Sequence, residues 1–91
     1  MSKHNRARHD KLMTLEHSQW SRFIDLLRGK EGCDFQGEPP KTTWRCLGYE
    51  DKSLSKSILL RFFPKVDIKS TMEYFERSGG FCDCEVVFNI A

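Results

Sequence analysis

The chain has 91 residues, enough for one domain with a single modest hydrophobic core, and this length excludes a large multi-domain enzyme. No apolar run is long enough to span a membrane and no apolar segment follows the first methionine, so we expect a cytoplasmic protein without a secretory signal. Aromatic residues make up 12% of the chain, which argues against disorder because disordered chains are poor in them.

Positive charge is concentrated at the N-terminus, although the whole chain has a formal net charge of only +2. The first 13 residues contain one acidic residue, Asp10, and four basic residues, Lys3, Arg6, Arg8 and Lys11. We therefore predict a flexible basic tail over residues 1–13 and a single domain over residues 14–91. The alternative is that the tail binds nucleic acid, because basic side chains displace counterions from phosphates.

The first predicted element of the domain is a helix from Leu15 to about Arg28, with Thr14 as its N-cap. Its apolar residues recur at the spacing of one helical face: Trp20, Phe23, Ile24 and Leu27. Residues 29–42 contain glycines and prolines and are predicted to form a loop, after which residues 43–47 form a short strand.

Two further helices are predicted from the apolar pattern of the following segment. One covers residues 54–63, where Ser53 or Asp51 is positioned to cap it. The other covers residues 68–78, with Asp67 as its N-cap. Together with the first helix, these elements supply most of the apolar surface available for a core.

The last segment, residues 82–90, alternates between apolar and polar positions, a pattern typical of a half-buried strand. We predict that it pairs antiparallel with residues 43–47 and that the three helices pack on this small sheet, which gives an α+β domain. The predicted core combines residues from these elements: Trp20, Phe23, Leu27, Ile58, Phe62, Phe75, Val86 and Phe88.

The chain contains four cysteines: Cys33, Cys46, Cys82 and Cys84. Four thiolates suffice for a tetrahedral structural zinc site, which would tie the loop to the terminal strand. In an extended strand the Cys82 and Cys84 sulfurs would lie roughly 6.5–7 Å apart, whereas two thiolates on one zinc ion lie about 3.7–4 Å apart, so zinc binding requires a bend. Reduced core thiols and a disulfide or redox pair are the alternatives.

The C-terminal segment also carries a family resemblance. Residues 79–90 read Gly-Gly-Phe-Cys-Asp-Cys-Glu-Val-Val-Phe-Asn-Ile, which resembles the C-terminal signature of a bacterial family of unknown function, DUF2695. The helix before this segment, Cys33-Asp34 and Trp44-Arg45-Cys46 resemble the same family, so the resemblance covers roughly residues 20–90. Some members have a histidine directly after the first Cys-Asp, where this chain has Phe35, and Cys46 would then supply the missing ligand. The resemblance implies a shared fold and no particular activity.

The sequence shows no catalytic constellation, and we expect that the protein is not an enzyme. His17 is predicted on a helix surface, and Asp83 and Glu85 are predicted to be solvated strand residues or partners of Arg45. We therefore predict a small protein-binding module stabilised by zinc, with an inhibitor or regulator carried by a phage or mobile element as a special case. The alternative is a nucleic-acid-associated factor that uses the basic tail.

Overall fold

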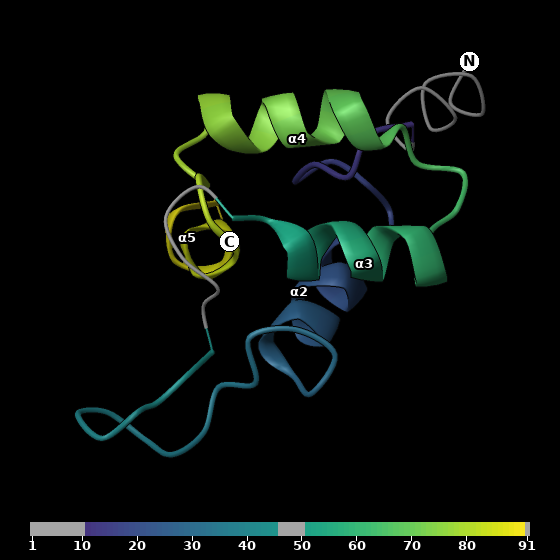
Figure 1. The fold of residues 1–91 in the computed structure, drawn as a ribbon. Coiled ribbons are helices and arrows are strands. Elements are labelled where there is room, and N and C mark those ends of the chain that lie inside the picture. The colour runs from purple at the N-terminus through teal and green to yellow at the C-terminus, as the bar shows by residue number, and fades with distance from the viewer. Residues whose placement is uncertain (1–10, 46–50, 91) are drawn as a thin grey trace.

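The computed structural model describes residues 11–45 and 51–90, and their regular structure is helical. Three helices form the body of the domain: α2 (Trp20–Arg28), α3 (Ser53–Phe62) and α4 (Ile68–Arg77). A single helical turn, α5 (Asp83–Glu85), continues into a π-helical segment, η1 (Val86–Ile90). Figure 1 shows α3 and α4 antiparallel to each other, with α2 packed below α3 and α5 beside the start of α3.

The expected α+β architecture is wrong, because residues 11–45 and 51–90 contain no strand. The predicted strand over residues 43–47 is reduced to one isolated bridge, in which Thr43 and Gln36 exchange two backbone hydrogen bonds of 2.8 Å. The last two residues of that predicted strand lie outside the described residues. This bridge closes the tip of the long loop between α2 and α3 and starts no sheet.

The predicted strand over residues 82–90 is also wrong, because this segment forms α5 and η1. Its buried apolar residues are Cys82, Val86 and Ile90, which are four residues apart. Residues four positions apart lie on one face of a helix. They also lie on one face of a strand, where every second residue points the same way, so the sequence pattern fitted both structures. Phe88 distinguishes the strand from the helix. The predicted strand would bury its side chain, but 57% of Phe88 is exposed.

A close approach at Gly80 fixes the C-terminal segment against the end of α4. A Cβ atom at this position would lie 2.9 Å from Val86 Cγ2 and 2.9 Å from Ile90 Cδ1. Only glycine leaves room for both side chains without a shift. The double glycine therefore ends α4, as predicted. Gly80 also allows the Val86 and Ile90 side chains of η1 to pack against its backbone.

The segment before α2 is a series of turns and not the predicted first part of a helix. α2 begins at Trp20, five residues later than expected. The side chain of Thr14 accepts a hydrogen bond from the Glu16 backbone N–H, and His17 Nδ1 accepts one from the Gln19 backbone N–H. Such local side-chain bonds compete with helical backbone bonds, which explains the late start. His17 is buried and packs edge-on against Phe63, although a solvated position was predicted.

Residues at the end of the predicted basic tail are packed on the domain. The Met13 side chain is fully buried, and its backbone N–H donates to Thr71 Oγ1 at 3.1 Å. The Lys11 carbonyl accepts a hydrogen bond from the Asp67 backbone N–H at 2.7 Å. The predicted boundary after residue 13 therefore falls within a packed segment, while residues 1–10 lie outside the described part of the chain.

The core is an aromatic cluster around Phe23. Its ring stacks on Phe75 at a centroid distance of 5.8 Å and contacts Trp20 and Phe63 at 5.5 and 6.4 Å. Six of the eight predicted core residues are buried: Trp20, Phe23, Leu27, Ile58, Phe75 and Val86. Phe62 is half-buried and Phe88 is exposed, so the prediction fails for Phe88. No helix within the described ranges is long and apolar enough to cross a lipid bilayer.

Replacing Phe75 or Phe88 by alanine tests this assignment of the core. Phe75→Ala should lower the free energy of unfolding by about 3–5 kcal/mol, because it empties a fully buried aromatic site. Phe88→Ala should cost about 1 kcal/mol, the worth of exposed ring contacts. Urea denaturation of both variants measures the difference, and equal losses would contradict the helical position of Phe88.

Candidate functional site

Cys82 and Cys84 form a close pair of thiols at the start of α5. Their sulfur atoms lie 3.3 Å apart, and Cys82 is buried while Cys84 is half-buried. Cys82 has an extended backbone conformation and Asp83 begins the helical turn, so the chain bends between the two cysteines. This bend brings the sulfurs far closer than an extended strand would, and a pair this close is compatible with binding one metal ion.

The other two predicted metal ligands belong to the loop between α2 and α3. Cys33 is fully buried, and its backbone carbonyl accepts a hydrogen bond from the Arg45 N–H at 2.6 Å. Cys46 follows Arg45 and lies outside the described residues. Within residues 11–45 and 51–90, no three side chains of His, Cys, Asp or Glu are grouped as a metal site. The structure thus unites Cys82 with Cys84 and leaves the four-cysteine site as a prediction.

Arg45 fastens the end of this loop to its beginning. Its Nε and Nη2 atoms donate to the Gly32 carbonyl at 3.1 and 2.6 Å, and Nη2 also donates to the Lys30 carbonyl at 3.1 Å. Pairing of Arg45 with Asp83 or Glu85 was one of the predicted alternatives, but the Arg45 side chain donates to backbone oxygens of Gly32 and Lys30 instead. The two ends of the loop over residues 29–45 are therefore held together.

Asp83, which lies between Cys82 and Cys84 in the sequence, caps the start of α3. Its Oδ1 atom accepts hydrogen bonds from the Ser55 N–H and hydroxyl at 2.8 and 2.7 Å, and Oδ2 accepts one from the Leu54 N–H at 3.2 Å. The side chain is fully buried, which contradicts the predicted solvated position. Burial raises the pKa of this carboxyl, whereas the hydrogen bonds from Ser55 and Leu54 act in the opposite direction.

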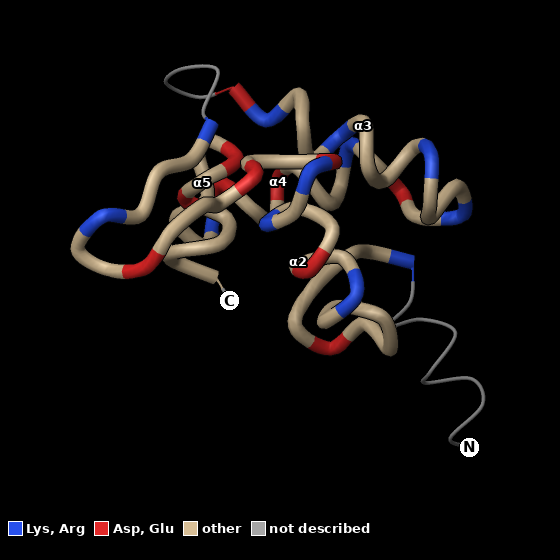
Figure 2. The backbone as a smooth tube through the Cα atoms, turned by 90° about the horizontal axis from the view of Figure 1, so that it is seen from below, with Lys and Arg blue, Asp and Glu red and all other residues tan. Residues whose placement is uncertain are grey.

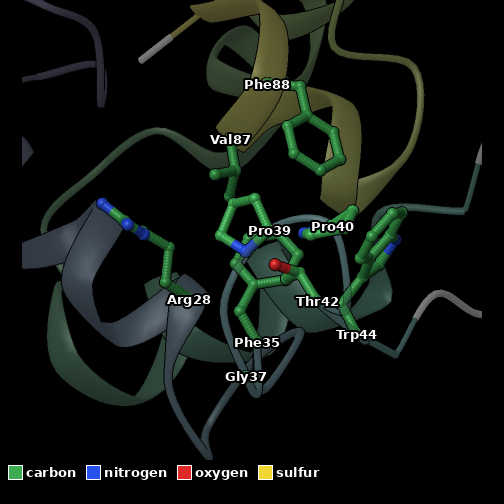
Figure 3. Close-up of a pocket in the computed structure, with 9 residues that line it drawn as sticks. All are labelled: Arg28, Phe35, Gly37, Pro39, Pro40, Thr42, Trp44, Val87 and Phe88. Atoms are coloured by element: carbon green, nitrogen blue, oxygen red, sulfur yellow. The ribbon is translucent and has the colours of Figure 1, made fainter.

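A cluster of three aromatic rings lies at the surface of the domain. The Phe35, Trp44 and Phe88 ring centroids are 5.3–5.6 Å apart, while 45% of Trp44 and 57% of Phe88 is exposed. Beside the rings is an open groove of about 820 Å³, here named the aromatic groove (Figure 3). Its lining consists of Arg28, Phe35, Gly37, Pro39, Pro40, Thr42, Trp44, Val87 and Phe88.

The aromatic groove is absent from the sequence-based predictions. Trp44 and Phe88 were assigned to paired strands, and Phe35 was considered only as a replacement for a metal-binding histidine. One sequence signal could have indicated that Phe35 and Trp44 lie close together. Each is two residues from a cysteine of the predicted zinc site, Phe35 from Cys33 and Trp44 from Cys46. Figure 2 shows basic and acidic residues mixed along this loop, and Arg28 is the one charged residue in the lining of the groove.

Most of the residues predicted to bind nucleic acid lie outside the described part of the chain. Three of its residues, Lys3, Arg6 and Arg8, lie outside the described residues. The fourth, Lys11, is exposed and anchors α4 through its backbone carbonyl. The alternative based on a basic tail therefore stays a prediction.

Comparison with known proteins gives one match. Residues 51–89 match the model of a family described as a protein of unknown function, DUF2695. The matched segment begins before α3 and includes α4, α5 and most of η1, but it excludes the loop that carries Cys33 and Trp44. No curated protein and no solved structure matches the chain.

The capping role of Asp83 predicts a large effect of its removal. Asp83→Ala should lower the free energy of unfolding by about 2–4 kcal/mol, because it leaves the buried Ser55 donors without an acceptor. Asp51→Ala is the matched control, since the Asp51 carboxylate is exposed and, among the described residues, is hydrogen-bonded by Ser53 alone, and the loss of stability should be clearly smaller. Urea denaturation compares the two; similar losses would show that Asp83 is not the main cap of α3.

Proposed function

We propose that the chain is a small protein-binding module. Residues 51–89 belong to the DUF2695 family, whose function is unknown, so this proposal is based on the surface of the chain. Its binding face is the aromatic groove. The occupant is an extended segment of a partner protein, which would lie between the loop over residues 29–45 and the C-terminal segment.

The observation that carries this proposal is the exposure of the aromatic cluster. Phe35, Trp44 and Phe88 come from distant positions in the chain, yet they pack on one another at the surface while a separate aromatic core forms around Phe23. Exposure of tryptophan and phenylalanine rings to water is unfavourable, and these residues are enriched at the centres of protein interfaces. A groove of about 820 Å³ beside such rings has the size of a binding site.

We further assign Cys33, Cys46, Cys82 and Cys84 to one structural zinc ion. The distance of 3.3 Å between the Cys82 and Cys84 sulfurs supports this, because a small opening of the pair gives the spacing of two thiolates on zinc, about 3.7–4 Å. The hydrogen bond from Arg45 to the Cys33 carbonyl supports it too, since Cys46 is the next residue in the chain. Bound zinc would supply a cross-link between the loop and α5.

Such a cross-link would hold the binding face together. Each ring of the aromatic cluster lies two to four residues from a cysteine: Phe35 from Cys33, Trp44 from Cys46 and Phe88 from Cys84. A metal joining these cysteines would fix the three chain segments that carry the rings. A rigid groove binds more tightly than a flexible one because less entropy is lost on binding.

Binding is favoured over catalysis by the surroundings of the thiols. A thiol nucleophile needs a nearby base, and His17 is the one histidine within the described ranges. Its ring packs against Phe63 in the turn before α2, whereas the thiol pair lies at the start of α5. Asp83, which lies between the thiols, is committed to the cap of α3.

The binding face is tested by selecting peptides from a random display library on the folded protein. Peptides that bind should lose affinity about thirtyfold with Trp44→Ala and Phe88→Ala, the effect expected for central interface residues. Leu60→Ala is the matched control, because Leu60 is 56% exposed but lies on α3, outside the groove. Recovery of no peptide that depends on Trp44 or Phe88 would refute the proposed function.

The zinc assignment is tested by elemental analysis of protein purified without chelator, which should give about one zinc ion per chain. A strong chelator should lower the melting temperature, and Cys84→Ser should lower it in the zinc-loaded protein. In chelator the wild type and Cys84→Ser should melt at nearly the same temperature, which separates metal loss from a packing defect. Metal-free protein whose melting temperature is insensitive to chelator would refute the assignment.

A further inference from the structure

The aromatic groove has one charged side chain in its lining, that of Arg28, which makes no ion pair with another described residue. Arg28 ends α2 and is exposed, whereas Lys52 pairs with Glu76 and Arg61 pairs with Glu31. Figure 3 shows Arg28 on one side of the groove and Trp44 and Phe88 on the other, with Pro39 and Val87 between them. An occupant that spans the groove therefore meets a guanidinium at one end and aromatic rings at the other.

A second polar group in the lining lacks a partner. Thr42 Oγ1 is the one side-chain nitrogen or oxygen of the described residues that is buried without a hydrogen bond. A covered hydroxyl without a partner is unfavourable, and rotation about its Cα–Cβ bond would turn it toward an occupant. An acceptor such as a backbone carbonyl on the occupant would satisfy it.

The geometry of the rings decides between a peptide and a nucleic acid. Trp44 meets both Phe35 and Phe88 edge to face, at interplanar angles of 79° and 76°. A run of stacked bases needs ring faces that lie nearly parallel to one another, whereas Trp44 lies nearly perpendicular to both Phe35 and Phe88. Proline rings fit between such edges and faces, and a polyproline II segment leaves its carbonyls without internal hydrogen bonds.

We propose that the occupant of the aromatic groove is an acidic, proline-containing segment of a partner protein in the polyproline II conformation. Its carboxylate pairs with Arg28, its prolines pack on Phe35, Trp44 and Phe88, and one of its carbonyls accepts a hydrogen bond from Thr42. This inference rests on the proposed function of the groove and adds the chemistry of the partner.

The probes are capped synthetic peptides in which an aspartate precedes a Pro-Pro-Leu-Pro segment by one, two or three residues, together with versions that carry asparagine for aspartate or alanine for the prolines. Isothermal titration calorimetry, which needs no tryptophan signal, should show binding of at least one aspartate peptide. Replacement by asparagine should weaken it about three- to tenfold, and replacement of the prolines about tenfold or more.

Matched variants of the protein assign the contacts. Arg28→Gln should remove the preference for aspartate over asparagine, whereas Lys41→Gln, a charge loss on the loop over residues 29–45 but outside the lining, should keep it. Thr42→Val should weaken all peptides about three- to fivefold, the worth of one hydrogen bond. Higher salt should reduce the preference for aspartate in the wild type and have no such effect in Arg28→Gln.

Each outcome assigns success or failure to a definite part of the proposal. Equal binding of aspartate and asparagine peptides, or equal effects of Arg28→Gln and Lys41→Gln, would overturn the acidic partner but leave the protein-binding groove. Binding by alanine-substituted peptides as tight as by the proline peptides would overturn the polyproline segment. Peptide binding unaffected by Trp44→Ala and Phe88→Ala would overturn the groove itself, as would binding of an oligothymidylate, but no peptide, that depends on Phe88.

Discussion

The fold depends on the buried carboxylate of Asp83. Its oxygens accept hydrogen bonds from Leu54 and Ser55 at the start of α3, where backbone N–H groups have no partner within the helix. The Asp83 N–H in turn donates to the Asp51 carbonyl at 3.1 Å. One residue thus joins the C-terminal segment to the beginning of α3, and charge-assisted bonds of this kind are strong when buried. A helical turn satisfies its own backbone hydrogen bonds, whereas a strand needs a partner strand. The turn at α5 can therefore lie against the start of α3 and place the Asp83 carboxylate there.

The candidate site follows from this anchor. Because Asp83 is held against α3, the cysteines on either side of it are fixed beside α3, and η1 leaves the anchor in a direction that presents Phe88 to the loop. Arg45 supplies the complementary anchor by binding the Gly32 and Lys30 carbonyls. The aromatic groove lies where these two anchored segments meet, so its shape depends on tertiary hydrogen bonds at both sides.

The proposed zinc ion would strengthen a contact that is weak in its absence. The loop over residues 29–45 has an isolated bridge at its tip, and its Phe35 and Trp44 rings contact Phe88 of η1. Small domains bury little apolar surface, and a metal cross-link is a common way to hold a loop that cannot form a core of its own. Exposed rings at the surface are unfavourable for a protein alone, and a proline-containing partner would cover them.

The sequence alone determined the helices over α3 and α4, the cap at Asp67 and most of the aromatic core, because helical spacing and capping are local properties. It predicted that Cys33, Cys46, Cys82 and Cys84 bind one zinc ion, and of these four the structure brings Cys82 and Cys84 together. Tertiary structure decided the C-terminal segment, since a spacing of four fits both a strand and a helix and only the cap of α3 by Asp83 selects the helix. It also decided the aromatic groove, because Phe35, Trp44 and Phe88 are far apart in sequence and meet only when the loop and η1 pack together.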